Sequence, residues 1–219
     1  MSLKTILNKE TDFTGEFPVE LAKDGLWRFN DAAPDADTCL VDSSGKERKA
    51  YINKWSGTTA SLTDGIFGTY FRMNINNPSS EQTYLRVSND GSIFSNIGDR
   101  IIVGGWIRPT TYSVGNTYTP LLSTRGGTGQ PIFYLSLIRG NPRLMLYNSS
   151  GSLILDTSVT PPFSLENAKW YFIAAVIEPG NRRAWYVVGS KDSGVVWKSA
   201  ALSLSGELNW SCTADLIWG

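Results

Sequence analysis

Three aromatic side chains and one arginine form the first group of residues with useful chemistry. Tyr112 and Tyr118 lie in a stretch rich in Gly, Asn and Thr, and Arg125 follows in a Ser-Thr-Arg-Gly-Gly segment. Aromatic rings offer an apolar face with a polar edge, and arginine donates hydrogen bonds to hydroxyls. Trp185 and Tyr186 are adjacent, so in a strand they point to opposite faces and one ring is a candidate for exposure. We predict a ligand-binding site at Tyr112, Tyr118, Arg125 and Trp185, and the alternative is ordinary surface.

Carboxylate side chains do not form a catalytic pattern. Glycosidases need two carboxyl groups about 5–5.5 Å apart, or about 6.5–9.5 Å apart when they invert configuration. The glutamates are dispersed, apart from Glu10, Glu16 and Glu20 near the N-terminus. The sequence contains no histidine, which excludes Ser-His-Asp and Cys-His schemes. We predict that the protein is not an enzyme, and a glycoside hydrolase with unrecognised carboxylates is the least favoured alternative.

Three aspartates are the candidate metal ligands. Asp31, Asp35 and Asp37 lie together in a Pro- and Ala-containing segment, and carboxylate oxygens are what Ca²⁺ prefers. Their spacing is not that of an EF-hand loop, and a solvated acidic loop is the alternative. We therefore expect no cofactor, with Ca²⁺ at these three residues as the one candidate.

Charge and composition exclude several partner classes. Lys+Arg and Asp+Glu both total 20, so the formal net charge is zero, whereas nucleic-acid binding requires a basic footprint. No apolar run approaches the ~18 residues of a membrane span, and no signal peptide is visible. Two cysteines, Cys39 and Cys212, do not make a disulfide framework and are expected to be small core residues. These features fit a virion protein assembled in the cytoplasm or an extracellular, cell-surface protein expressed without its signal.

The elements that must position these residues are predicted to be β-strands. Short runs rich in Val, Ile, Tyr, Phe and Trp are bounded by Gly, Pro, Asn, Asp and Ser. The run 69–75 alternates polar and apolar residues, whereas 170–177 is apolar on both faces and belongs in the middle of a sheet that is covered on both sides. The predicted strands are 26–29, 69–75, 83–87, 100–108, 120–124, 132–139, 143–147, 152–156, 169–178, 183–189, 194–198 and 214–218. This pattern predicts an all-β, two-sheet antiparallel sandwich.

The order of several motifs resembles the laminin-G-like, concanavalin-A-like jelly-roll family. The opening Gly-Leu-Trp-Arg-Phe-Asn at 25–30 and Asp-Ser-Ser-Gly at 42–45 are similar to its first strand and turn. Further similar motifs are 68–73, 84–87, 105–109, 169–174 and 184–189. The resemblance places Trp27, Trp106 and Trp170 on core strands, and implies a lectin-like carbohydrate-binding fold. Two positions depart from the family pattern: Tyr171 replaces its usual His, and Val188 replaces its usual Asp.

Domain organisation and biological role follow from these interpretations. Residues 1–23 are mixed and charged, and are predicted to be an arm or linker, while residues 24–219 form the sandwich domain. The family usually adds one more strand after the position of residue 219. An open sheet edge would invite pairing, which favours a homo-oligomer. The leading hypothesis is an adhesion module of a phage or prophage tail or head appendage that binds surface glycan. The alternative is a purely structural protein whose arm binds other virion or surface proteins.

Overall fold

The computed structural model describes residues 50–53, 59–65, 68–74, 84–89, 91, 93–94, 100–109, 118–124, 131–209 and 212–218. These residues form strands, turns and extended loops, which confirms the all-β prediction. The described part of the chain contains no helix of the length and apolarity needed to cross a membrane. The strands are β1 (Ala50–Asn53), β2 (Thr59–Gly65), β3 (Gly68–Asn74), β4 (Tyr84–Val87), β5 (Ile101–Ile107), β6 (Tyr118–Thr124), β7 (Phe133–Ile138), β8 (Asn141–Tyr147), β9 (Leu153–Ser158), β10 (Tyr171–Glu178), β11 (Arg183–Ser190), β12 (Val196–Lys198), β13 (Leu202–Ser203) and β14 (Leu216–Trp218).

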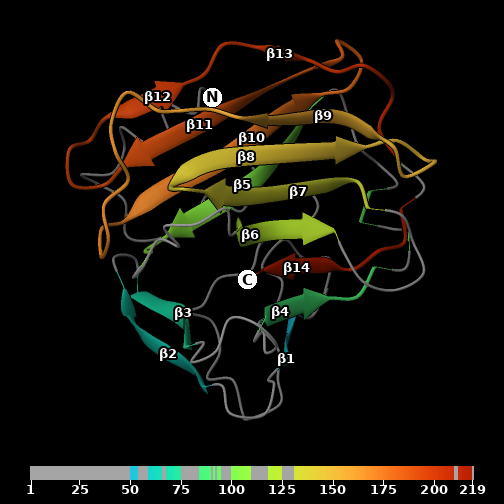
Figure 1. Ribbon diagram of the computed structural model, residues 1–219. Helices are drawn as coiled ribbons and strands as arrows, with labels where there is room; N and C mark the ends of the chain where they lie inside the picture. Colours follow the sequence, from blue (N-terminus) through green and yellow to red (C-terminus); the bar gives the residue numbers. More distant parts are fainter. Residues whose placement is uncertain are drawn as a thin grey trace.

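Two antiparallel sheets make up the sandwich (Figure 1). The larger sheet has seven strands in the order β1-β4-β14-β6-β7-β8-β9, and the smaller has five, in the order β12-β11-β10-β5 with β13 beside β11. Strands β2 and β3 form a separate two-stranded sheet. In β8 the side chains alternate in burial, with Leu144 and Leu146 fully buried and Arg143, Met145 and Tyr147 partly exposed. This alternation places the core on one face of the larger sheet.

The core lies between the two sheets. Phe133 and Leu135 of the larger sheet belong to the same buried cluster as Ile177 and Tyr186 of the smaller sheet. Tyr186 also joins the sheets through a polar contact, because its hydroxyl donates a hydrogen bond of 2.5 Å to the carbonyl oxygen of Thr157. The strand predicted at 170–177, apolar on both faces and in the middle of a sheet, is confirmed. It corresponds to β10, which is buried along nearly its whole length and pairs with both β5 and β11.

Two core predictions are wrong. Trp106 is only partly buried, and it contacts Phe172 edge-on with ring centroids 5.6 Å apart. Phe172 precedes the inward-facing Ile173, so both rings lie on the outer face of the smaller sheet. Trp170 is also only partly buried and precedes β10. Trp27 lies outside the described residues.

Strand β14 lies inside the larger sheet, between β4 and β6. The buried Asp215 just before it accepts a hydrogen bond of 2.6 Å from Arg86 Nε and one of 3.1 Å from the backbone N–H of Asn89. The Asn89 amide in turn donates to the carbonyl oxygens of Cys212 and Ala214. This network fixes the approach to β14. Cys212 is buried and is not in a disulfide, as expected for a small core residue, whereas Cys39 lies outside the described residues.

Candidate functional site

Trp185 lies on the outer face of the smaller sheet, the face turned away from the seven-stranded sheet. Its neighbour Tyr186 is fully buried in the core between the sheets, and adjacent residues of a strand point to opposite faces. Trp185 packs in a separate small cluster with Val176 and Val187. Val176 is its register partner on β10. The indole therefore belongs to the outer surface layer of the sandwich.

Three cationic side chains surround the Trp185 ring. The Lys198 ammonium nitrogen lies 4.4 Å from the ring centroid, and the guanidinium carbons of Arg100 and Arg183 lie 5.6 and 5.7 Å from it. All three distances are within the range of cation–π attraction. The cations come from three places: the residue before β5, the first residue of β11 and the last residue of β12. Together with the valines they leave Trp185 only 8% exposed.

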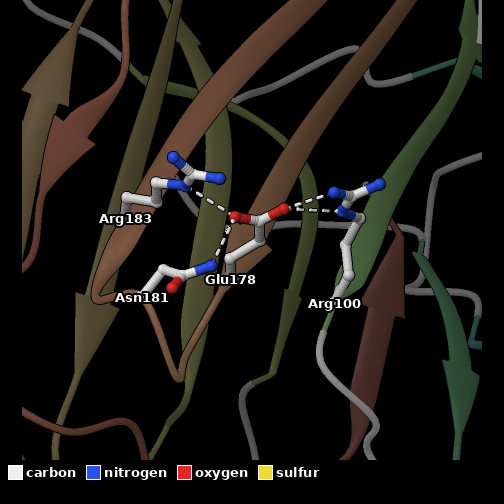
Figure 2. A network of polar contacts seen from close by, with 4 residues as sticks. All are labelled: Arg100, Glu178, Asn181 and Arg183. Carbon is white, nitrogen blue, oxygen red and sulfur yellow. Dashed lines mark hydrogen bonds and ion pairs between the residues drawn. The ribbon is translucent and has the colours of Figure 1, made fainter.

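Glu178 holds the two arginines in place (Figure 2). Its Oε1 accepts hydrogen bonds from Arg100 Nε, at 2.9 Å, and from Arg100 Nη2. Its Oε2 accepts bonds from Arg183 Nε at 2.6 Å and from Asn181 Nδ2 at 3.1 Å. The hairpin between β10 and β11 makes this possible, because Glu178 and Arg183 are register partners across it. The Glu178 side chain is 5% exposed, whereas those of Arg100 and Arg183 are 56% and 48% exposed.

These contacts fix the charge state of the site. The hydrogen bonds from Arg100, Arg183 and Asn181 to the charged carboxylate lower the pKa of Glu178 from 4.5 to about 2. Glu178 is therefore an anion at neutral pH and cannot donate a proton. The three cations around Trp185 together with the one Glu178 carboxylate give these four side chains a net charge of +2.

Apolar side chains flank the charges on both edges of the sheet. Ile102 on β5 is 53% exposed and is the register partner of Val176, beside Trp185. Val196 on β12 is 37% exposed and is two residues from Lys198. The outer face thus presents hydrogen-bond donors around Trp185, near the end of the sheet where β10 and β11 are joined, with apolar side chains beside them. We call the seven residues Arg100, Ile102, Glu178, Arg183, Trp185, Val196 and Lys198 the Trp185 platform.

Comparison with solved structures gives the same β-sandwich in several binding domains. The chain is similar to the binding domain of Paraclostridial Mosquitocidal Protein 1, with a TM-score of 0.59 and 16% identity over 83% of this chain and 43% of that one. It is also similar to domain 4 of AbnA, an extracellular arabinanase from Geobacillus stearothermophilus solved in complex with arabinotriose, with a TM-score of 0.56 and 16% identity over 83% of this chain and 78% of that one. A third match is the binding domain of botulinum neurotoxin DC in complex with SialylT, with a TM-score of 0.58 and 12% identity over 84% of this chain and 43% of that one.

The chain shares its fold with these binding domains. It spans less than half the length of the two toxin domains. No protein-family model matches the sequence. No curated protein matches it either. At these identities the likeness concerns the fold alone, and it agrees with the two-sheet β-sandwich predicted from the sequence.

Of the four residues predicted to bind ligand, the structure describes Tyr118 and Trp185, which lie in different sheets. Tyr118 is the first residue of β6 in the larger sheet, where it pairs with Ile138. The predicted strand 120–124 began two residues later and left Tyr118 outside it. Trp185 is on β11 in the smaller sheet, and neither it nor Tyr186 is exposed. Tyr112 and Arg125 lie outside the described residues, as do Asp31, Asp35 and Asp37. Within the described ranges, no three His, Cys, Asp or Glu side chains gather as a metal-binding group.

Sequence reasoning missed the charged members of the platform. The pairing of Glu178 with Arg183 was within reach, because the Pro-Gly-Asn turn marks a hairpin and the strands on either side set the register. Alternation would then place both on the same face as Trp185. Arg100 and Lys198 gave no such signal. Arg100 is far away in sequence, and Lys198 comes from a three-residue strand.

Proposed function

We propose that this chain is a non-catalytic carbohydrate-binding domain that serves adhesion. The observation that carries the proposal is the fold, a sandwich that matches a domain in complex with arabinotriose over 83% of this chain. The Trp185 platform adds a solvent-exposed set of hydrogen-bond donors flanked by apolar side chains, which is the combination that a sugar surface offers in complementary form.

The buried carboxylates support a role without catalysis. Glycosidases need a carboxylic acid whose pKa is raised, so that it can protonate the leaving group. Glu178 has the opposite property, since its ion pairs lower its pKa to about 2. Both carboxylate oxygens of Asp215 accept a hydrogen bond, one from Arg86 Nε and one from the backbone N–H of Asn89. Among the described residues, these two are the buried acidic side chains.

The setting that we propose is a tail or head appendage of a phage or prophage particle, with a bacterial surface protein as the second possibility. The support is the sequence: the net charge is zero, and residues 1–23 have the mixed, charged composition of an arm. In this setting the ligand is a surface polysaccharide, and the arm binds other virion proteins or a second copy of the chain. Membership in the laminin-G-like family and Ca²⁺ at Asp31, Asp35 and Asp37 are proposals that rest on the sequence alone.

A glycan array with the purified protein displayed on multivalent beads tests the proposal, because single modules bind weakly and avidity raises the signal. We expect saturable binding that free sugar competes away, and matching binding to whole bacterial cells. A parallel array with a chelator tests the calcium proposal, since binding that depends on Ca²⁺ would be lost.

Absence of binding to every glycan and to cells would overturn the carbohydrate proposal and favour the structural alternative. That alternative predicts a defined oligomer or partner complex that disappears when residues 1–23 are deleted. Light scattering on the full chain and on the shortened chain measures this directly.

A further inference from the structure

The Trp185 ring itself is closed to a sugar. Its exposed fraction is 8%, and the side chains of Arg100, Arg183 and Lys198 lie around it. A pyranose needs an open aromatic face to stack on, and this ring does not offer one. The face of the indole is instead occupied by the cationic groups of the three side chains, which it attracts through cation–π contacts. What a ligand meets at this surface is therefore charge, and not an aromatic ring.

Several donors of the platform remain available. Arg100 uses Nε and Nη2 for Glu178, and Arg183 uses Nε. Within the described part of the chain, Arg100 Nη1, both Nη groups of Arg183 and the Lys198 ammonium make no hydrogen bond or ion pair with protein. These groups come from guanidinium and ammonium ions, whose hydrogen bonds to carboxylate, sulfate or phosphate are the strong, charge-assisted kind.

The cations are also held in place before any ligand binds. Glu178 fixes the two arginines through a buried carboxylate, and the indole attracts all three cations. Ordering a long side chain on binding costs conformational entropy. A platform that is already ordered avoids part of this cost, and its four charged side chains keep a net charge of +2.

From this geometry we infer that the Trp185 platform selects acidic glycans, those that carry carboxylate or sulfate groups, over neutral ones. The inference rests on the proposed function and specifies its ligand class. The acidic group binds the outward N–H groups of Arg100, Arg183 and Lys198. The exposed Ile102 and Val196 contact the C–H surfaces of the sugar rings on either side.

The test compares pairs of polysaccharides that differ only in charge. The probes are dextran sulfate against dextran, for sulfate, and polygalacturonate against its carboxyl-reduced form, for carboxylate. Vesicles of phosphatidylserine and phosphatidylcholine serve as an anionic surface without sugar. Binding of each probe to the full chain is measured by biolayer interferometry, from about 0.05 M to about 0.5 M NaCl, over which screening of exposed charges grows strongly.

Lys198→Gln is the first variant, because Lys198 contacts the indole and leaves the Glu178 network intact. Arg183→Gln is the second variant. A thermal melt checks that the domain still folds when Glu178 has lost this partner. The matched control is Arg108→Gln, which removes the same charge at the far end of the outer face, where Arg108 Nε donates to the carbonyl oxygen of Ala168. We expect about fivefold to tenfold weaker binding of the acidic probes for each platform variant, the range for one charge-assisted hydrogen bond at an exposed site, and no change for Arg108→Gln.

The possible results separate the inference from the proposed function. Preference for acidic probes that is lost in the platform variants alone supports both. Equal binding of charged and neutral probes, unchanged in the variants, overturns the acidic selectivity and leaves carbohydrate binding in place. An equal loss in all three variants, or equal binding to the vesicles, shows general charge attraction and overturns the inference. Failure to bind any glycan, including the neutral ones, overturns both.

Discussion

Replacing Trp185 by alanine tests how much the packing of the indole in the platform contributes to the stability of the domain. A tryptophan side chain buries roughly 150–250 Å², and Trp185 is 8% exposed. At about 25 cal/mol per Å² the hydrophobic contribution is roughly 3.5–6 kcal/mol, of which alanine keeps a small part. The lower end applies here, because the long cationic side chains can swing into water and leave no closed cavity. We expect Trp185→Ala to destabilise the domain by about 3 kcal/mol.

Thermal unfolding followed by near-ultraviolet circular dichroism measures this loss. For a domain of this size, about 3 kcal/mol corresponds to a melting temperature lower by roughly 6–12 °C. Trp185→Phe keeps an aromatic face and is expected to lose about 1 kcal/mol. A melting temperature within about 2 °C of the parent for Trp185→Ala would show that the ring is not packed as described. A double-mutant cycle with Lys198→Gln should give a coupling of about 0.5–1 kcal/mol, the size of an exposed cation–π contact.

Three further predictions address the packing and the charge of the two sheets. Gly104→Ala is expected to lower the free energy of unfolding by about 2 kcal/mol or more, because a Cβ there would lie 2.2 Å from the carbonyl oxygen of Ile173. Gly105→Ala is the control in the same thermal melts and should be much milder, because a Cβ at Gly105 meets nothing within 4 Å. Ser136→Ala is expected to raise the melting temperature by about 2–4 °C, because the buried Ser136 hydroxyl has no hydrogen-bond partner and its removal gains about 1 kcal/mol; an unchanged or lower value would mean that the hydroxyl is satisfied. The ion pairs lower the pKa of Glu178 below its ordinary 4.5, so their contribution to stability is complete above about pH 4.5 and is lost as the pH falls toward 2. Melts over this range should show a smaller pH slope for Glu178→Gln than for the parent, and equal slopes would contradict the assignment.

The strands were predictable where side-chain patterns are strong. The run around β10 is aromatic and β-branched, and the structure places it between two neighbours in a sheet, as predicted. The strands β1 and β2 were missed, since Ala50–Asn53 is short and Thr59–Gly65 is polar and ends in glycine. The face of Trp106 was predicted wrongly because β5 carries apolar residues on both faces, so alternation alone does not say which one is buried.

The candidate site was predictable only in part. Adjacency correctly put Trp185 and Tyr186 on opposite faces, but it could not show that both are buried. Arg100 and Lys198 help to bury Trp185. They lie next to it because sheet pairing brings together strands that are far apart in the sequence. Such contacts depend on the register of three strand pairs at once. A single sequence specifies these registers only where a tight turn joins the strands.

The position of β14 has a consequence for how the larger sheet forms while the chain is being synthesised. Arg86 and Asp215, which fix β14 beside β4, are 129 residues apart in sequence. A ribosome adding about 5–20 residues per second needs roughly 6–26 s to make that length of chain. During this time one side of β4 has no permanent partner, because β14 separates it from β6 in the finished sheet. Released chains that are truncated before Leu216 are therefore expected to be digested by protease much faster than released chains that include Trp218. The larger sheet can therefore be completed only after a segment far along the chain has been made and has paired with two strands that were made well before it.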